Sequence, residues 1–212
     1  MVRTQLRARG IEDERVLAAM AEVPRERFLA EEQRPDAYRD GALPIGEGQT
    51  MSQPWIVACM TALLELEGDE RVLEVGTGSG YGAAVLSRCC AEVVTIERYP
   101  TLAERARATL AELGYTNVEV RVGDGAAGAP DRAPFGGISV TASVVGEPSP
   151  TWFEQLAPGA ALVCPVRHDH NEELMRFRDG RREPVVPVRF VPLVSERPEG
   201  ADETEPDEGA EL

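Results

Sequence analysis

Apolar positions along this chain change spacing several times, from the runs typical of buried strands to the spacing typical of helices. Strand-like apolar runs lie at residues 71–75, 92–97, 117–121, 137–141 and 160–166. Helix-like segments follow three of these runs, at residues 80–90, 101–113 and 150–156. Strands that alternate with helices predict a doubly wound, mostly parallel sheet in an α/β, Rossmann-like fold.

The part of the chain before this alternation predicts two further features. Residues 3–32 show helical spacing and predict an N-terminal helical cap. Residues 33–52 form a long stretch rich in Gly, Pro and Asp but studded with apolar residues, which indicates an ordered active-site loop. Ser52 is placed to cap a helix that runs from Pro54 to about Leu66, with Gly68 ending it.

The end of the chain predicts a different arrangement. Two β-like runs at residues 172–178 and 185–191 follow one another without a helix between them, which favours an antiparallel edge of the sheet. We therefore expect one domain over residues 1–194, with the helical cap and active-site loop in residues 1–52. Residues 195–212 are acidic and poor in apolar side chains, so we expect a disordered tail.

Charge and composition exclude several classes of function. The net charge is −15, of which −7 comes from the tail, and the remaining −8 argues against binding nucleic acid. Every one of the 22 basic residues is Arg, so no lysine chemistry is possible. No apolar run is long enough for a membrane span, and the start lacks the apolar core of a signal peptide, so we expect a cytoplasmic protein. The four cysteines form no C-x-x-C pair and are expected to be free thiols.

The most informative motif is the stretch at residues 71–80, where a strand-like run enters a G-x-G-x-G turn. Such a turn lets the backbone approach a ligand closely. Glu97 ends the next strand, 23 residues after Glu74, and is suited to hold ribose hydroxyls. Glu74 stands just before the turn, where an anion repels a pyrophosphate but suits a cationic ligand. The pattern therefore favours S-adenosylmethionine as the cofactor over a nicotinamide dinucleotide.

Several other segments resemble those of one family that uses S-adenosylmethionine. Together with the glycine turn, residues 42–54, 122–125 and 133–135 and the segment Val23–Phe28 closely resemble the protein-L-isoaspartate O-methyltransferase family, over about residues 2–194. The stretch Gln49–Pro54 is the most specific, because it looks like the family's active-site loop. The resemblance implies a class I methyltransferase that moves a methyl group from S-adenosylmethionine to isoaspartyl carboxylates in damaged proteins, which leads to their repair through a succinimide.

The resemblance also implies roles for individual residues. Ser52 matches the catalytic serine of the loop, which would orient a carboxylate that is already ionised and needs no general base. The implied cofactor-binding residues are Thr50, Met51, Glu74, Gly76, Thr77, Gly78, Glu97, Arg98, Asp124 and Gly125. The implied substrate-binding residues are Ile45, Gly46, Thr141 and Ala142. No metal site is expected, since the only candidate, residues 168–170, has the pattern of an exposed turn.

The sequence also departs from the family. Gly136 and Gly137 stand where members commonly have an Asp after Pro-Phe, and we expect them to loosen the strand entrance. Residues 143–147 diverge at the rim of the expected substrate groove. Two alternatives therefore stay open: methylation of a specific aspartate in a dedicated precursor peptide, or a SAM-binding module without catalysis. The oligomeric state is not determined by the sequence.

Overall fold

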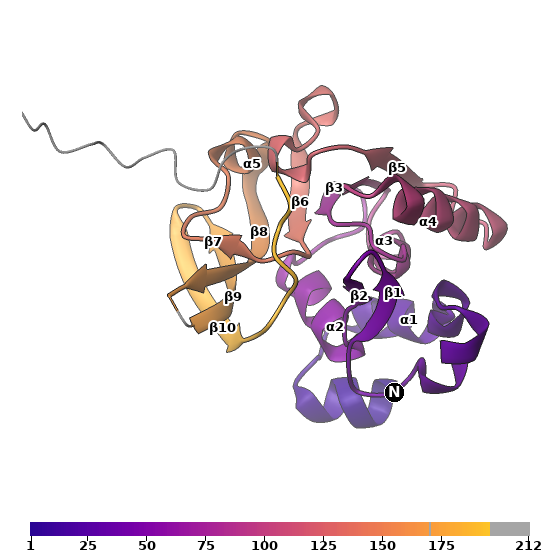
Figure 1. Ribbon diagram of the computed structural model, residues 1–212. Coiled ribbons are helices and arrows are strands. Elements are labelled where there is room, and N and C mark those ends of the chain that lie inside the picture. The colour runs from indigo at the N-terminus through magenta and orange to yellow at the C-terminus, as the bar shows by residue number, and fades with distance from the viewer. Residues whose placement is uncertain (170, 196–212) are drawn as a thin grey trace, which may run out of the picture.

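A computed structural model describes residues 1–169 and 171–195 of the chain (Figure 1). The predicted disordered tail, residues 195–212, lies outside the described residues except for Ser195. The strands of the main sheet are β3 (Arg71–Val75), β4 (Glu92–Glu97), β5 (Val118–Val122), β6 (Phe135–Val140), β7 (Val144–Val145), β8 (Leu156–His168), β9 (Asn171–Arg178) and β10 (Arg181–Pro187).

The sheet is doubly wound, as predicted. Its strand order is β10-β9-β8-β6-β3-β4-β5, with β7 paired to β8. The strands from β8 to β5 in this order pair in parallel, whereas β8 with β9 and β9 with β10 pair antiparallel. Figure 1 shows this antiparallel edge, in orange, on the opposite side of the sheet from β5. The prediction of a mostly parallel sheet with an antiparallel edge is thus confirmed.

Helices connect the strands close to where the sequence predicts them. They are α3 (Tyr81–Leu86), α4 (Pro100–Glu112) and α5 (Pro150–Glu154). Pro100 occupies the first turn of α4, where its missing N–H costs nothing, and Gly114 follows the helix at a φ of 78°. The first of these helices ends earlier than its predicted limit at residue 90.

The core is divided by the sheet. Successive strand residues point to opposite faces, so Val72 and Val93 join one buried cluster while Leu73 and Val94 join the other. The first cluster also contains the apolar residues of the N-terminal cap, and the second contains the fully buried Trp152 of α5. Covering both faces explains why the parallel strands read as continuous apolar runs.

The N-terminal cap is helical, as predicted. It consists of the short helices η1 (Val2–Leu6), η2 (Arg7–Arg9), α1 (Glu14–Glu22), η3 (Arg25–Phe28) and η4 (Glu31–Asp36). Asp13 begins α1 by accepting hydrogen bonds from the backbone N–H groups of Arg15 and Val16. Figure 1 shows these indigo and purple segments gathered beside α2 (Pro54–Leu63).

The stretch predicted as a loop at residues 33–52 is ordered, but it contains more regular structure than predicted. Besides the end of η4, it forms an antiparallel hairpin of β1 (Leu43–Gly46) and β2 (Gln49–Met51). Glu47 and Gly48 connect the strands at φ values of 52° and 69°. Two consecutive left-handed residues make the turn that best matches the twist of a hairpin.

The prediction that Ser52 caps the next helix is wrong. Gln53 occupies the N-cap position of α2 and makes no side-chain capping bond. Pro54 stands in the first turn and forces the preceding residue to be extended, so the N-cap conformation falls on Gln53. The helix ends at Leu63 rather than near Leu66.

Two predictions for the second half of the chain are also corrected. The last strand spans Arg181–Pro187 instead of residues 185–191, because the tight turn at Asp179 and Gly180 sets its register against β9. The glycines of β6 do not loosen its start. A Cβ on Gly136 would lie 2.6 Å from the Cβ of Glu70, so the missing side chain allows close packing there.

Three other features concern the cysteines, membrane-spanning helices and metal sites. All four cysteines are free and buried, as predicted. Across the described parts of the chain, no helix combines the length and the apolarity that crossing a bilayer requires. The same residues contain no group of three or more His, Cys, Asp or Glu side chains that could hold a metal ion.

Candidate functional site

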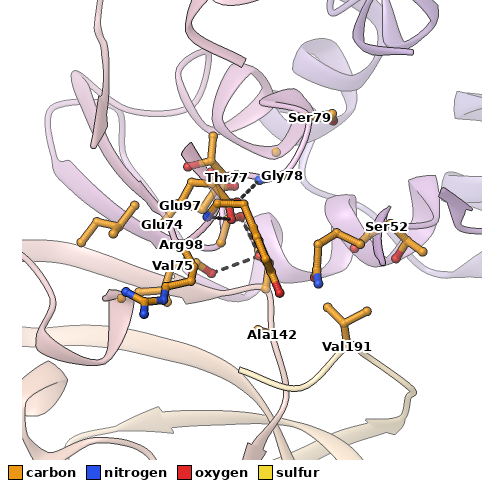
Figure 2. A pocket seen from close by; sticks show the side chains of 18 of the residues that line it. Ser52, Glu74, Val75, Thr77, Gly78, Ser79, Glu97, Arg98, Ala142 and Val191 are labelled. Atoms are coloured by element: carbon orange, nitrogen blue, oxygen red, sulfur yellow. Dashed lines mark hydrogen bonds between the residues drawn. The ribbon is translucent and has the colours of Figure 1, made fainter. Parts of the chain in front are cut away.

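The main pocket lies at the carboxyl ends of β3, β4 and β6 (Figure 2). β4 lies on one side of β3 and β6 on the other, and such a reversal of strand order is where open α/β sheets bind ligands. The pocket is open to solvent and encloses about 800 Å³ when its mouth is included. Its lining includes most of the predicted cofactor residues: Thr50, Met51, Glu74, Gly76, Thr77, Gly78, Glu97, Arg98 and Gly125.

The carboxylate of Glu97 fixes the glycine turn. One of its oxygens accepts a hydrogen bond of 2.7 Å from the backbone N–H of Gly78, and the other accepts one of 3.0 Å from the N–H of Tyr99. Figure 2 shows Glu97 directed toward Thr77 and Gly78. A carboxylate can accept about four hydrogen bonds, so acceptor capacity is left for a ligand in the pocket.

Glu74 lies behind the same turn and is almost completely buried. Its carboxyl group accepts a hydrogen bond of 2.6 Å from the Thr95 hydroxyl, which lies 2.7 Å from the Thr77 hydroxyl. Burial raises the pKa of Glu74 to about 8, the Thr95 bond lowers it, and the nearby Glu97 adds to the rise. This carboxyl therefore holds a proton at neutral pH until a cation or a higher pH favours its charge.

Thr141, which follows β6, closes the other side of the turn. Its hydroxyl donates to the carbonyl oxygens of Val75 at 3.0 Å and Gly76 at 2.7 Å. Gly76 has a φ of 97°, and a Cβ there would lie 2.3 Å from the Thr141 hydroxyl oxygen. Only glycine fits this position, which explains why the turn begins with a glycine.

Ser52 lies at a junction between two cavities. It lines the main pocket, and it also lines a neighbouring groove between the end of the hairpin and the segment Pro187–Val191. Three other residues line both cavities: Thr50, Thr141 and Val191. Among the described residues, the Ser52 hydroxyl has no hydrogen-bond partner, so it is available to a ligand. Figure 2 shows Ser52 and Val191 across the pocket from Glu97.

Four predicted residues do not line the cavities where they were expected. Asp124 does not line the pocket, and its carboxylate accepts hydrogen bonds from the Ala126 N–H and the Ser195 hydroxyl. Ile45 and Gly46 do not line the groove and lie instead beside Gly78 and Arg105, respectively. Ala142 lines the main pocket rather than the groove.

One wall of the pocket was not predicted from the sequence. Val191–Val194, which follow β10, line the main pocket. This segment is held by backbone hydrogen bonds of 2.8 Å from Ser143 to Val191 and from Leu193 to Ser143. A possible signal was the apolar run that continues beyond the predicted strand, since a solvated turn would be polar.

Comparison with known proteins agrees with this geometry. A sequence model of the protein-L-isoaspartate(D-aspartate) O-methyltransferase family matches residues 1–198. The chain belongs to this family. Relatives named protein-L-isoaspartate O-methyltransferase include one from Opitutus terrae, 51% identical over 203 residues that cover 93% of this chain and 87% of the relative. Another, from Roseiflexus sp., is 54% identical over 190 residues, which cover 88% of this chain and 87% of the relative.

Solved structures of the family show the same fold. A protein-L-isoaspartate O-methyltransferase of known structure has a TM-score of 0.80 and 31% identity over 88% of this chain, which spans 62% of the length of that structure. A Plasmodium falciparum protein solved in complex with S-adenosyl-L-homocysteine has a TM-score of 0.76 and 23% identity, over 89% of this chain and 94% of its own. At 23% identity, the similarity to the Plasmodium falciparum protein supports the fold but not the function.

The pocket lining fits S-adenosylmethionine. Glu97 is the acidic residue at a strand end that suits the ribose hydroxyls of a nucleoside. The pocket is lined by two carboxyl groups, Glu74 and Glu97, and one arginine, Arg98. A bound sulfonium would favour the charged form of Glu74, whereas a pyrophosphate would not, so the lining suits a sulfonium better. Ile96 and Leu193 add apolar surface to the lining, as is usual in cofactor sites.

The protonated state of Glu74 leads to a prediction about the stability of the protein. Its pKa is raised from 4.5 to about 8, so its contribution to folding is fully present below pH 4.5 and is lost as the pH rises toward 8. Glu74→Gln removes this loss. The free energy of unfolding of the variant, relative to the original protein, should therefore increase by up to about 1.4 kcal/mol per pH unit between about pH 5 and 8. Urea unfolding at several pH values measures it, and a difference that stays constant with pH would contradict the assignment.

Proposed function

We infer that this chain transfers a methyl group from S-adenosylmethionine to the carboxylate of L-isoaspartyl residues in damaged proteins. The observation that supports this most directly is the sharing of Thr50, Ser52, Thr141 and Val191 by the pocket and the groove. A donor in the pocket and a peptide in the groove would meet at Ser52. Family membership gives the same activity.

The cofactor supplies a methyl group on a sulfonium, which leaves as a neutral thioether when the carboxylate oxygen takes the methyl group. Because the carboxylate is ionised at neutral pH, the protein needs to align the groups and exclude water rather than remove a proton. The groove agrees with this need, since Arg189 is the only ionisable residue among the described residues that line it. We assign to the Ser52 hydroxyl the role of orienting the carboxylate.

Methylation converts the carboxylate into a better electrophile. The neighbouring backbone amide nitrogen can then attack the ester carbonyl, and the methoxy group leaves as methanol with the amide proton, which closes a succinimide. Hydrolysis of that ring returns some ordinary aspartyl residues. The four free, buried cysteines fit a reducing compartment, so we propose that this repair takes place in the cytoplasm. The proteins acted on would be those carrying isoaspartyl residues.

The test of this function uses two peptides of one sequence, with an isoaspartyl or an aspartyl residue at the same position. We expect transfer of label from methyl-labelled S-adenosylmethionine to the isoaspartyl peptide only. Activity confined to an aspartyl residue of one partner peptide would favour a dedicated precursor peptide as substrate. Cofactor binding without transfer to either peptide would favour a non-catalytic module.

Ser52→Ala tests the orienting role. Turnover of the isoaspartyl peptide should fall about 10- to 1,000-fold, because one positioned donor is lost, while affinity for S-adenosylhomocysteine stays nearly unchanged. Ser87→Ala is the matched control, since that hydroxyl donates to the Ala84 carbonyl at 2.7 Å and lines neither cavity. Steady-state kinetics distinguishes the variants; equal turnover in both would exclude Ser52 from the reaction.

Glu97→Ala tests the cofactor site. The loss of a charge-assisted hydrogen bond, worth about 1.5–3 kcal/mol, should weaken S-adenosylhomocysteine binding by about 10- to 150-fold in calorimetric titration. The control is Glu92→Ala at the other end of β4, where the carboxylate pairs with Arg71 and Arg132 instead. Unchanged affinity of the Glu97→Ala protein would show that this carboxylate serves only the glycine turn.

A further inference from the structure

Arg25, in η3 of the helical cap, is buried without a carboxylate partner. Its exposed fraction is 0%, and no ion pair within the described residues includes it. Burial lowers the pKa of its guanidinium. Removing a cation from water is costly, so a chain that needed only packing here would be served better by an apolar side chain.

The guanidinium is held instead by two backbone carbonyls and an aromatic ring. Its Nε donates to the carbonyl of Ala37, and its Nη2 donates to the carbonyl of Ser52, both at 2.7 Å. The guanidinium carbon lies 4.6 Å from the centre of the Tyr81 ring. Its third nitrogen, Nη1, is buried without a partner. The planar fork thus contacts three separate parts of the chain at once.

These three contacts surround the candidate site. Ala37 and Ser52 lie before and after the hairpin of β1 and β2, so one side chain fixes both ends of the segment that contains Thr50 and Met51. Tyr81 begins α3 directly after the glycine turn and lines the main pocket. Arg25 itself lines neither the pocket nor the groove.

We propose that Arg25 is the positioning residue for Ser52: its fork holds the Ser52 backbone against the helix that follows the glycine turn and leaves the Ser52 hydroxyl free for the substrate. The inference rests on the proposed function, because it assumes that Ser52 orients the substrate carboxylate. The buried charge is retained for geometry, since two carbonyls from different segments are held only by a planar donor with fixed angles.

Arg25→Lys is the first test. An ammonium group on a flexible stem keeps the charge but cannot donate to both carbonyls in the same geometry. We expect kcat on the isoaspartyl peptide to fall at least about 10-fold, because a small displacement of a positioned group costs this much. KM for the peptide and the Kd of S-adenosylhomocysteine should stay within about 2-fold, since Arg25 lines neither the pocket nor the groove.

Arg88→Lys is the matched control. The Arg88 guanidinium lies over the Tyr115 ring at 4.5 Å, much as Arg25 lies over Tyr81, but Arg88 pairs with Glu22 and contacts no part of the hairpin. This variant should keep kcat unchanged. A loss of kcat equal to that of Arg25→Lys would show a general effect of replacing ring-stacked arginines and would overturn the proposal.

A double-mutant cycle with Ser52→Ala separates positioning from a general structural role. If Arg25 acts through Ser52, Arg25→Lys should lower kcat less than about 2-fold once the Ser52 hydroxyl is gone. An equal loss in both backgrounds would overturn the proposal. If Ser52→Ala alone leaves kcat unchanged, the role assigned to Ser52 fails, and the inference fails with it. If the original protein does not methylate the isoaspartyl peptide, the proposed function itself is wrong.

A second variant covers the case in which Arg25→Lys does not fold. Tyr81→Leu removes the ring under the guanidinium and leaves both carbonyl bonds possible. Because Tyr81 lines the pocket, the Kd of S-adenosylhomocysteine is measured first and kcat is compared at saturating cofactor. A fall in kcat that disappears in the Ser52→Ala background supports the proposal, and a fall that persists there overturns it.

Discussion

The carboxylate of Glu97 is the interaction on which the site depends. It ends β4, yet it binds the backbone N–H of Gly78, which follows β3, and that of Tyr99, which precedes α4. Two neighbouring parallel strands are thereby joined at their carboxyl ends, where their own ladder has stopped. This external partner helps to fix the path of the glycine turn, because its three glycines have no side chains with which to do so.

The position of Glu97 also decides the electrostatic character of the pocket. Glu74 lies on the neighbouring strand, and both carboxyl groups are withdrawn from water. Burial of its carboxyl group is the main reason that Glu74 keeps its proton at neutral pH, and repulsion from the nearby Glu97 adds to the effect. A bound cation relieves this repulsion and a bound pyrophosphate increases it. A Rossmann-like fold can bind either S-adenosylmethionine or a nicotinamide dinucleotide, and the two acids favour S-adenosylmethionine.

Sequence patterns predicted the parts of this structure that depend on local periodicity. The central strands and α4 were located within one or two residues, because buried parallel strands and amphipathic helices have strong signals. The hairpin of β1 and β2 was missed, since strands of four and three residues leave no periodicity to read. The wall at Val191–Val194 depends on contacts with distant segments. The segment Val23–Phe28 resembled the family, but nothing in it indicated that Arg25 is buried, because an arginine beside a glutamate normally indicates a solvated surface.

The wall at Val191–Val194 has a consequence for the synthesis of this enzyme. The glycine turn, both acids and Ser52 are all made before residue 98, but the apolar wall of the same pocket comes from a segment nearly a hundred residues later. A chain still on the ribosome that has not reached Val194 lacks one side of its cofactor pocket. Newly made enzyme therefore acquires its complete binding site only once Val194 has been synthesised, after all the strands of the main sheet.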